Sequence, residues 1–452
     1  MQQKNEAILF SSCTGLNDSE EASDAKYTPD GVTDVIGCIN VTTTAKGKLV
    51  KVPALVPVLT HTSNIDELSA GSRMFVQSGT GIGLCDGSVI TPLSVPPVVV
   101  PGAKAVFIHT PVDTRIRVNS TDRYKVPSAG TAAAVLAVGV NPVPVTSAVL
   151  EKMPDFTGGF VLGAKLYTAK DKFLQYSEDY SYDLFNIGNN FIGNKNAVLQ
   201  CGQVPGCIAT LHADGVTAYL GTGPHDFEKK FFPCAVIPGT LYSGFISKVY
   251  ESAHTFLCSD GLYVLRADGS FVNLTVANTQ YLGNLNSVYN TVTVIGGKYL
   301  AFGNSLCVEY DFTVKALLLR GTAGVTASCQ FEEKTYTAAG NVLSTYSTAQ
   351  STEKLTCKVT LPYSNFGTPE YKQIRFLYFT GKVTGSAKVT VRNRFGDSAV
   401  TDVSNIGLTQ KRKITGLRTC KGPELSVEIE VRSGLFSLEE LTCAFMTCSN
   451  FR

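Results

Sequence analysis

The stretch HTFLCSDGLYVLRADGSFVNLT, residues 254–275, decides the fold class of this chain. Its short runs of Val, Leu, Phe and Tyr contain the residue types that favour extended strands. Asp-Gly pairs separate these runs, and such pairs are typical of tight turns between antiparallel strands. Helical periodicity is nearly absent here and along the rest of the chain. The stretch therefore predicts successive antiparallel strands joined by short turns.

The same pattern recurs at intervals of about 40 to 50 residues, which is the repeat length of a propeller blade. A single four-stranded sheet cannot bury both of its faces, but stacking such sheets around a ring covers them. The pattern predicts an all-β fold with propeller-like repeats of short antiparallel hairpins; a series of β-sandwiches is the alternative. The predicted turns lie near Gly87, Asp171, Gly215, Asp268, Phe312 and Gly340.

The last hundred residues differ from the repeats in charge and in strand length. Residues 354–452 contain 15 Lys and Arg against 8 Asp and Glu, a net charge of +7, while the whole chain carries +2. In LSVEIEV, residues 425–431, apolar and polar residues alternate as in a strand with one buried face. We expect an N-terminal arm over residues 1–30, a propeller-like domain over 31–350 and a C-terminal β-sandwich over 354–452.

Composition argues against several classes of protein. Only 17% of the 452 residues are charged, and the near-neutral total gives no global basic field for nucleic acid. The thirteen cysteines include no C-x-x-C pair, so we expect reduced, buried thiols and no zinc ribbon. The uncharged residues 126–150 contain three prolines, which favours an extended linker over a membrane span.

Residues able to carry chemistry are scattered. The glycines of residues 79–83 fit a hairpin turn better than a phosphate-binding loop, because a strand follows them where a helix would be needed. His225 and Asp226 are neighbours on an extended chain, so their side chains point to opposite faces. Asp179 and Asp183 lie in an acidic loop without the glycine of a calcium loop. We therefore expect no enzyme activity, no catalytic residue, no metal and no cofactor.

Two clusters remain as candidate partner or subunit interfaces. Five cations within residues 411–421 can contact phosphates or an acidic partner surface, although a solvated loop and strand face is the simpler explanation. Five aromatic residues within residues 176–191 can anchor an interface or pack beneath a long loop. The residues are Lys411, Arg412, Lys413, Arg418 and Lys421 in the first cluster and Tyr176, Tyr180, Tyr182, Phe185 and Phe191 in the second.

The order of several motifs resembles that of tailed-bacteriophage virion proteins. The N-terminal segment YTPDGVTDVIGCINVTTTAKGKLVKVPALVPVLT contains Asn40-Val41, a short turn and a return strand at residues 49–53. Within residues 48–53 only Lys48 and Lys51 are basic, where the return strand of that family usually carries several arginines. The motifs SRMFVQSGTGIGLCDGS, IPGTLYSG and CSDGLYVLRADGSFVNLT, and the closing RFLYFTGKVTGSAKVTVRN and LEELTCAFMTC, look like those of the same family.

This resemblance implies a β-propeller-type tail protein, either a hub or nozzle or a tail-tip component. It implies a homo-oligomeric ring, usually a hexamer, that joins other tail or portal-side virion proteins. The ring would line the route for genome ejection, with transient passage of phage DNA and no membrane span. The implied location is the virion tail, after assembly in the host cytoplasm. A tail-tip module for receptor binding or host attachment is the alternative.

Overall fold

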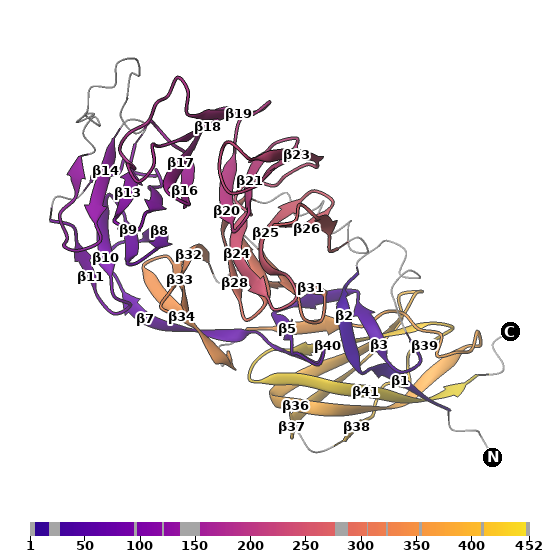
Figure 1. Cartoon of the computed structure of the whole chain (residues 1–452). Coiled ribbons are helices and arrows are strands. Elements are labelled where there is room, and N and C mark those ends of the chain that lie inside the picture. Colours follow the sequence, from indigo (N-terminus) through magenta and orange to yellow (C-terminus); the bar gives the residue numbers. More distant parts are fainter. Residues whose placement is uncertain are drawn as a thin grey trace, which may run out of the picture.

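The computed structural model describes residues 5–17, 28–94, 97–119, 122–135, 154–275, 288–304, 306–321, 324–351, 355–407 and 411–448. All regular elements in these ranges are strands, which confirms the all-β prediction. Seven four-stranded antiparallel sheets form one part of the molecule, and a large sheet containing both the first and last strands forms the other (Figure 1).

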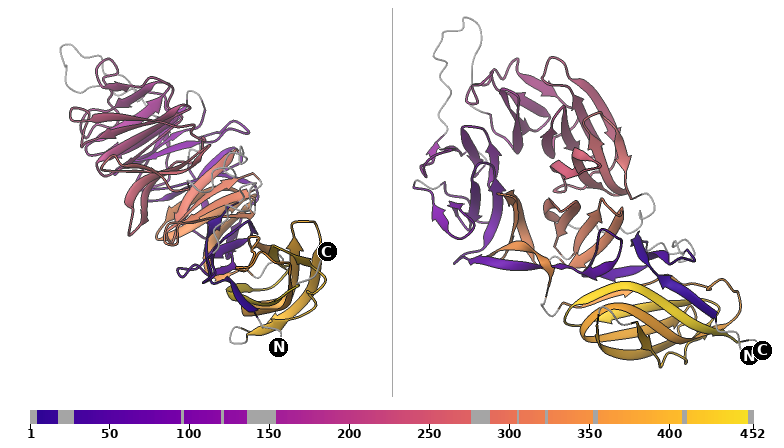
Figure 2. Two further views of the ribbon diagram at one scale, coloured as in Figure 1. Left: turned by 90° about the vertical axis from the view of Figure 1, so that its right-hand side faces the viewer. Right: turned by 60° about the horizontal axis from the view of Figure 1, so that its bottom comes forward.

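The seven small sheets are the blades of a propeller, arranged around a ring in the right view of Figure 2. The first strands of most neighbouring blades contact one another. The blades are, in order, β8 (Ile65–Ala70), β9 (Met74–Ser78), β10 (Gly81–Cys85), β11 (Ile90–Pro92); β12 (Val106–His109), β13 (Asp113–Arg117), β14 (Arg123–Pro127), β15 (Ala134–Val135); β16 (Gly158–Leu162), β17 (Lys165–Lys170), β18 (Phe173–Tyr176), β19 (Phe191–Gly193); β20 (Gln200–Val204), β21 (Cys207–His212), β22 (Gly215–Leu220), β23 (Glu228–Pro233); β24 (Tyr242–Ser247), β25 (Glu251–Cys258), β26 (Gly261–Arg266), β27 (Phe271–Asn273); β28 (Tyr289–Ile295), β29 (Lys298–Gly303), β30 (Leu306–Asp311), β31 (Ala316–Gly321); and β32 (Val325–Phe331), β33 (Lys334–Ala339), β34 (Val342–Gln350), β7 (Pro53–Thr60).

The ring is closed by a strand that precedes all the others of the propeller. β7 pairs antiparallel with β34, with Leu59 opposite Leu343 and Thr60 opposite Val342. Blade 7 is therefore built from segments almost three hundred positions apart in sequence. Closure of the ring depends on this long-range strand pairing, which no local pattern in the sequence predicts.

The propeller prediction is confirmed. The expected turns, however, belong to two different positions in the blade, between the second and third strands and between the third and fourth strands. Turns between second and third strands follow Ser78, Arg117, Lys170, His212, Cys258, Gly303 and Ala339. Asp171, Gly215 and Gly340 lie at these turns, whereas Gly87, Asp268 and Phe312 lie at the next turn outward. The two hairpins of a blade use the same turn residues, so the sequence pattern alone does not distinguish them.

The large sheet curls nearly into a barrel, and we call this part the barrel domain (Figure 2). Its central strand β36 is 22 residues long and pairs with five others. Its strands are β1 (Asn5–Phe10), β4 (Gly37–Ile39), β5 (Val41–Thr43), β6 (Leu49–Lys51), β35 (Cys357–Thr360), β36 (Lys372–Asn393), β37 (Ser398–Ile406), β38 (Arg412–Ile414), β39 (Lys421–Gly422), β40 (Leu425–Val431) and β41 (Phe436–Thr447).

The N-terminal segment belongs to the barrel domain, which differs from the expected limits. β1 pairs with β41, and β4 pairs with β35, so residues 5–10 are not a separate arm. The propeller begins at Pro53 instead of residue 31. A parallel pair of strands, β2 (Ser12–Leu16) and β3 (Val32–Val35), packs beside β31 of blade 6. The expected boundary near residue 350 agrees with the end of β34 at Gln350. Alternating apolar residues indicate a strand but do not indicate which sheet it joins.

The interior is apolar and contains most of the thiols. All thirteen cysteines are unpaired; eight are buried and five are half-buried. Burial raises the pKa of the Cys201 thiol to about 12, which keeps it protonated. The part of the chain that the structure describes contains no helix long and apolar enough to cross a membrane. Most of the uncharged stretch 126–150 lies outside the described residues.

A buried histidine links blades 4 and 5. The Nδ1 atom of His254 lies 2.8 Å from the Ser243 hydroxyl, and Nε2 lies 3.3 Å from the carbonyl oxygen of Cys207 in blade 4. Burial lowers the pKa of His254 to about 4, from a usual value of 6.5. The folded protein therefore holds this imidazole neutral at pH values where the unfolded chain protonates it.

We expect the free energy of unfolding to fall as the pH decreases from about 6.5 towards 4. Above this range His254 is neutral in both states; within it, only the unfolded state gains the proton, which costs of the order of 3 kcal/mol of stability by pH 4. Urea unfolding across this range measures the slope. His254→Gln is expected to make the slope shallower, although not flat, because burial also lowers the pKa of His109 to about 4; the exposed His225→Gln is expected to leave the slope unchanged. Equal slopes for the wild type and His254→Gln would contradict the assignment.

Candidate functional site

The junction between propeller and barrel contains a dense network of polar contacts. The chain passes from β6 of the barrel to β7 of the propeller through the single residue Val52, and it leaves the propeller after β34 at Ser351. The Ser351 N–H donates to the Val52 carbonyl (3.0 Å), and the Val52 N–H donates to the Asn40 carbonyl (3.1 Å). Both crossings are thus held side by side. We use "junction" for residues 40–52, Ser351, Thr356 and the charged groups of blade 6 described below.

Asn40 connects the crossings to blade 6. Its side-chain Nδ2 donates to the Thr356 carbonyl (2.8 Å), and its Oδ1 accepts from the Gly321 N–H at the end of β31 (2.9 Å). Asn40 is buried and has a φ of 55°. Asn tolerates this left-handed conformation better than most residues do. Through its side chain and its backbone carbonyl, Asn40 therefore connects both crossings with a propeller blade.

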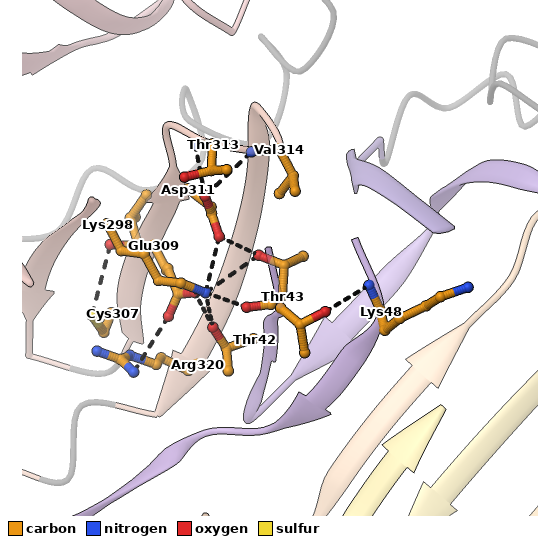
Figure 3. Close-up of polar contacts among 12 residues, drawn as sticks. Thr42, Thr43, Lys48, Lys298, Cys307, Glu309, Asp311, Thr313, Val314 and Arg320 are labelled. Atoms are coloured by element: carbon orange, nitrogen blue, oxygen red, sulfur yellow. Dashed lines mark hydrogen bonds and ion pairs between the residues drawn. The ribbon is translucent and has the colours of Figure 1, made fainter. Parts of the chain in front are cut away.

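Four charged side chains of blade 6 face the barrel strand β5 (Figure 3). Lys298 Nζ lies 3.0 Å from Asp311 and 3.3 Å from Glu309, and Arg320 Nη1 lies 3.3 Å from Glu309 Oε2. The last contact lacks hydrogen-bond geometry and is electrostatic. Glu309, Asp311 and Arg320 are buried, so the charges of this network must balance. They do, because the network contains two cations, Lys298 and Arg320, and two carboxylates.

Two threonines of β5 complete this network from the barrel side. Thr42 donates to Glu309 and accepts from Lys298 Nζ (2.6 Å). Thr43 donates to Asp311 (2.7 Å), and its carbonyl oxygen accepts from Lys298 Nζ (2.5 Å). An apolar core surrounds these contacts and continues from blades 5 and 6 into the barrel. Linked domains usually move relative to each other, but a shared core with a paired double crossing favours a rigid joint.

The junction contains the Asn40-Val41 motif, which is part of the resemblance to virion proteins. Asn40 holds the crossings, Val41 is fully buried, and Lys48 Nζ donates to the carbonyl oxygens of Ser11 and Glu439. Lys51 Nζ is buried and donates to the Gly434 carbonyl (3.0 Å). The two basic residues of the return strand therefore bind backbone carbonyls inside the barrel domain.

Sequence reasoning missed the charged network of blade 6. A usable signal was present, because Glu309 and Asp311 occupy alternate positions in the otherwise apolar strand β30, residues LCVEYD. Alternate positions face the same side of a strand. Two carboxylates on the covered side of a strand demand buried cations, and the neighbouring strands supply Lys298 and Arg320.

The five predicted basic residues lie on one edge of the barrel, but they do not form one cluster. Lys411 and Lys413 leave β38 on the same face, above the aromatic rings of β36. Arg412 lies between them in the strand, so its side chain leaves on the other face. The Arg418 guanidinium lies over the same ring as Lys413, that of Phe376. Lys421 belongs to β39 and lies opposite Gln373. Lysines also protect exposed sheet edges against unwanted pairing, which is the simpler explanation for this edge strand.

The five predicted aromatic residues divide between core and surface. Tyr176 and Phe185 are buried in blade 3, and Tyr182 packs half-buried against the cluster containing Phe185. Tyr180 is 84% exposed, and Phe191 contacts Phe173 edge-on at a ring distance of 5.6 Å. Tyr176, Tyr182 and Phe185 therefore pack in the core of the blade. An interface role stays a prediction for Tyr180 and Phe191.

The scattered polar residues have structural partners. The Asp226 carboxylate accepts hydrogen bonds from the backbone of Thr222 and Gly223, which shapes a turn beside His225. Asp179 pairs with Lys165 (2.8 Å). Asp183 pairs with Arg115 and with Lys125, 3.0 Å away. Within the described ranges, no group of three or more His, Cys, Asp or Glu side chains is placed to hold a metal ion.

Comparison with known proteins yields similarity in fold alone. No protein-family model matches the chain, and no curated protein matches its sequence. Among solved structures, streptogramin B lyase is similar at 8% identity and a TM-score of 0.44, over 65% of this chain and 97% of that one. The WD40 β-propeller domain of Doa1 is similar at 9% identity and a TM-score of 0.37, over 67% and 98%. YCF48 bound to the D1 peptide is similar at 9% and 0.40, over 66% and 100%. Scores at this level carry no argument about activity.

Proposed function

We propose that this chain is a structural virion protein of a bacteriophage tail. Copies of it form a symmetric ring, a hub or nozzle, that joins tail components and surrounds the route for genome ejection. The proposal includes a hexameric ring, portal-side or tail neighbours, assembly in the host cytoplasm and transient passage of DNA. Its sequence support is the motif order that resembles tailed-phage virion proteins, from residue 27 to residue 448.

The observation that carries the proposal is the construction of the junction. A component that joins two neighbours must hold its two binding surfaces in a fixed relation while force passes between them. The double crossing at Val52 and Ser351 and the buried contacts of Glu309 provide such a relation. The motif Asn40-Val41, on which the resemblance rests, lies in this joint.

Electron microscopy of the purified chain tests the proposal directly. We expect closed rings of a single rotational symmetry, six-fold by the resemblance, together with a matching oligomer mass in light scattering. Mass spectrometry of purified phage particles from the source should detect the chain as a stoichiometric tail component. A chain that stays monomeric at micromolar concentration and is absent from particles would exclude the proposal.

The alternative, a receptor-binding tail-tip module, has one specific observation in its favour. A hollow of about 900 Å³ is lined by Phe245 and Val249 of blade 5 and by Gly296, Gly297 and Phe312 of blade 6. Phe245 is 59% exposed and Val249 is 69% exposed, and exposed apolar side chains beside a hollow are typical of binding sites. Competition of the purified chain with phage adsorption, lost in Phe245→Ser, would favour this alternative.

A further inference from the structure

A cationic surface with a built geometry lies on the barrel, where β36 and β38 run side by side. Lys413 Nζ lies 3.6 Å from the centre of the Phe376 ring, and the guanidinium groups of Arg418 and Arg375 lie 5.7 and 6.0 Å from it. Lys411 Nζ lies 5.4 Å from the Tyr378 ring. We call these four cations and two rings the cationic face.

The rings hold these cations in place. The negative face of an aromatic ring attracts an ammonium or guanidinium group. The backbone carbonyl of Arg418 also accepts a hydrogen bond from the Gln373 amide (2.8 Å), which fixes the loop that carries it. Long cationic side chains normally lose conformational freedom when they bind a partner. Side chains that are already held in place lose less conformational freedom on binding, so the cationic face is preorganised to bind an anion.

The charges of the cationic face are largely unbalanced. For these four cations the structure records one ion pair, between Lys411 and Glu440 at 3.9 Å, among the residues that it describes. Both side chains of this pair are exposed, so it contributes little stability. An excess of positive charge on a small, positioned surface attracts a complementary negative surface.

The geometry favours a polypeptide over nucleic acid as the source of that negative charge. Proteins that bind single strands use aromatic faces on which bases stack, but the Phe376 ring is already covered by Lys413. Carboxylates need no stacking and pair readily with Lys and Arg.

We infer that the cationic face binds a carboxylate-rich polypeptide segment of a neighbouring component. The inference rests on the proposed function, in which the barrel meets a neighbour, and it names the chemistry of that neighbour. Contacts of carboxylates with Lys411, Lys413 and Arg418 supply the attraction, and Phe376 keeps two of these cations in place.

The test uses the full chain and fluorescently labelled poly-L-glutamate, with binding followed by anisotropy at low salt. The variant Lys411→Gln/Lys413→Gln/Arg418→Gln is expected to bind at least tenfold more weakly. The control Lys172→Gln/Lys195→Gln/Lys334→Gln removes the same charge from exposed positions on the propeller and is expected to bind like the wild type. Phe376→Leu keeps every charge but removes the ring, and about a two- to fivefold loss is expected.

Several results would overturn the inference. They are the absence of saturable binding to poly-L-glutamate, equal losses in the two triple variants, and tighter binding of oligothymidylate or duplex DNA than of poly-L-glutamate. If the chain forms rings but does not bind poly-L-glutamate, only this inference is contradicted. If the chain binds poly-L-glutamate but forms no rings, only the proposed function is contradicted.

Discussion

Glu309→Ala is expected to lower the free energy of unfolding by about 3–5 kcal/mol, the largest effect we expect from any single substitution in this chain. Glu309 is buried and contacts Lys298, Arg320 and Thr42. Its removal leaves the Arg320 guanidinium buried beside Tyr346 with no carboxylate partner. A buried charge without a partner costs far more than the lost contact alone.

Two further variants separate charge from shape at this position. Glu309→Gln preserves the volume and can still accept from Thr42, so a smaller loss is expected. Asp311→Asn leaves Lys298 with Glu309 and is likewise expected to be milder. Guanidinium unfolding followed by tyrosine fluorescence and by circular dichroism measures these differences. A loss below about 1 kcal/mol for Glu309→Ala would show that the network does not stabilise the joint.

The propeller was predictable because its signals are local. The Asp-Gly turn after Cys258 and the apolar strands around it lie within one blade, so a short window of sequence contains the whole pattern. The closing strand β7 was not predictable, because its pairing with β34 depends on distant residues. The same reason explains why β1 was expected in an arm and β4, β5 and β6 in the propeller: β1 and β41 are strands in the sequence but partners only in space.

The candidate site shows the same division between local and long-range information. The basic residues 411–421 were visible as a run, but their value depends on Phe376 and Tyr378, which come from another strand. Arg412 looked equivalent to its neighbours until the pleat of β38 placed it on the other face. The role of Asn40 could not be read from its neighbours in sequence, since its partners Thr356 and Gly321 lie about three hundred residues away.

Asn40→Ala gives the second large effect, with an expected loss of about 2–4 kcal/mol. The substitution removes the hydrogen bonds to the half-buried Gly321 N–H and to the carbonyl of the exposed Thr356, at a cost of about 0.5–1.5 kcal/mol each. It also places alanine at a φ of 55°, which is less favourable for alanine than for asparagine by about 1 kcal/mol. Guanidinium unfolding of the full chain measures the total.

The pair Asn40→Ala and Asn40→Gly distinguishes the two causes. Glycine adopts a positive φ without strain, so Asn40→Gly is expected to recover about 1 kcal/mol while both hydrogen bonds stay lost. If Asn40→Gly were as stable as the wild type, backbone conformation alone would account for the choice of asparagine, and the hydrogen bonds would contribute nothing measurable.

Calorimetry then shows whether Asn40 joins the domains or only stabilises one of them. The apolar core is continuous from blade 6 into the barrel, so the wild type is expected to unfold in one cooperative transition. Asn40 contacts both crossings and β31, and its loss weakens the joint more than either domain. Two separate transitions in Asn40→Ala would identify this residue as the coupling element, whereas one transition shifted to lower temperature would place its contribution within a single unit. Since the proposed ring needs a rigid subunit, we expect the first result, accompanied by fewer closed rings in micrographs.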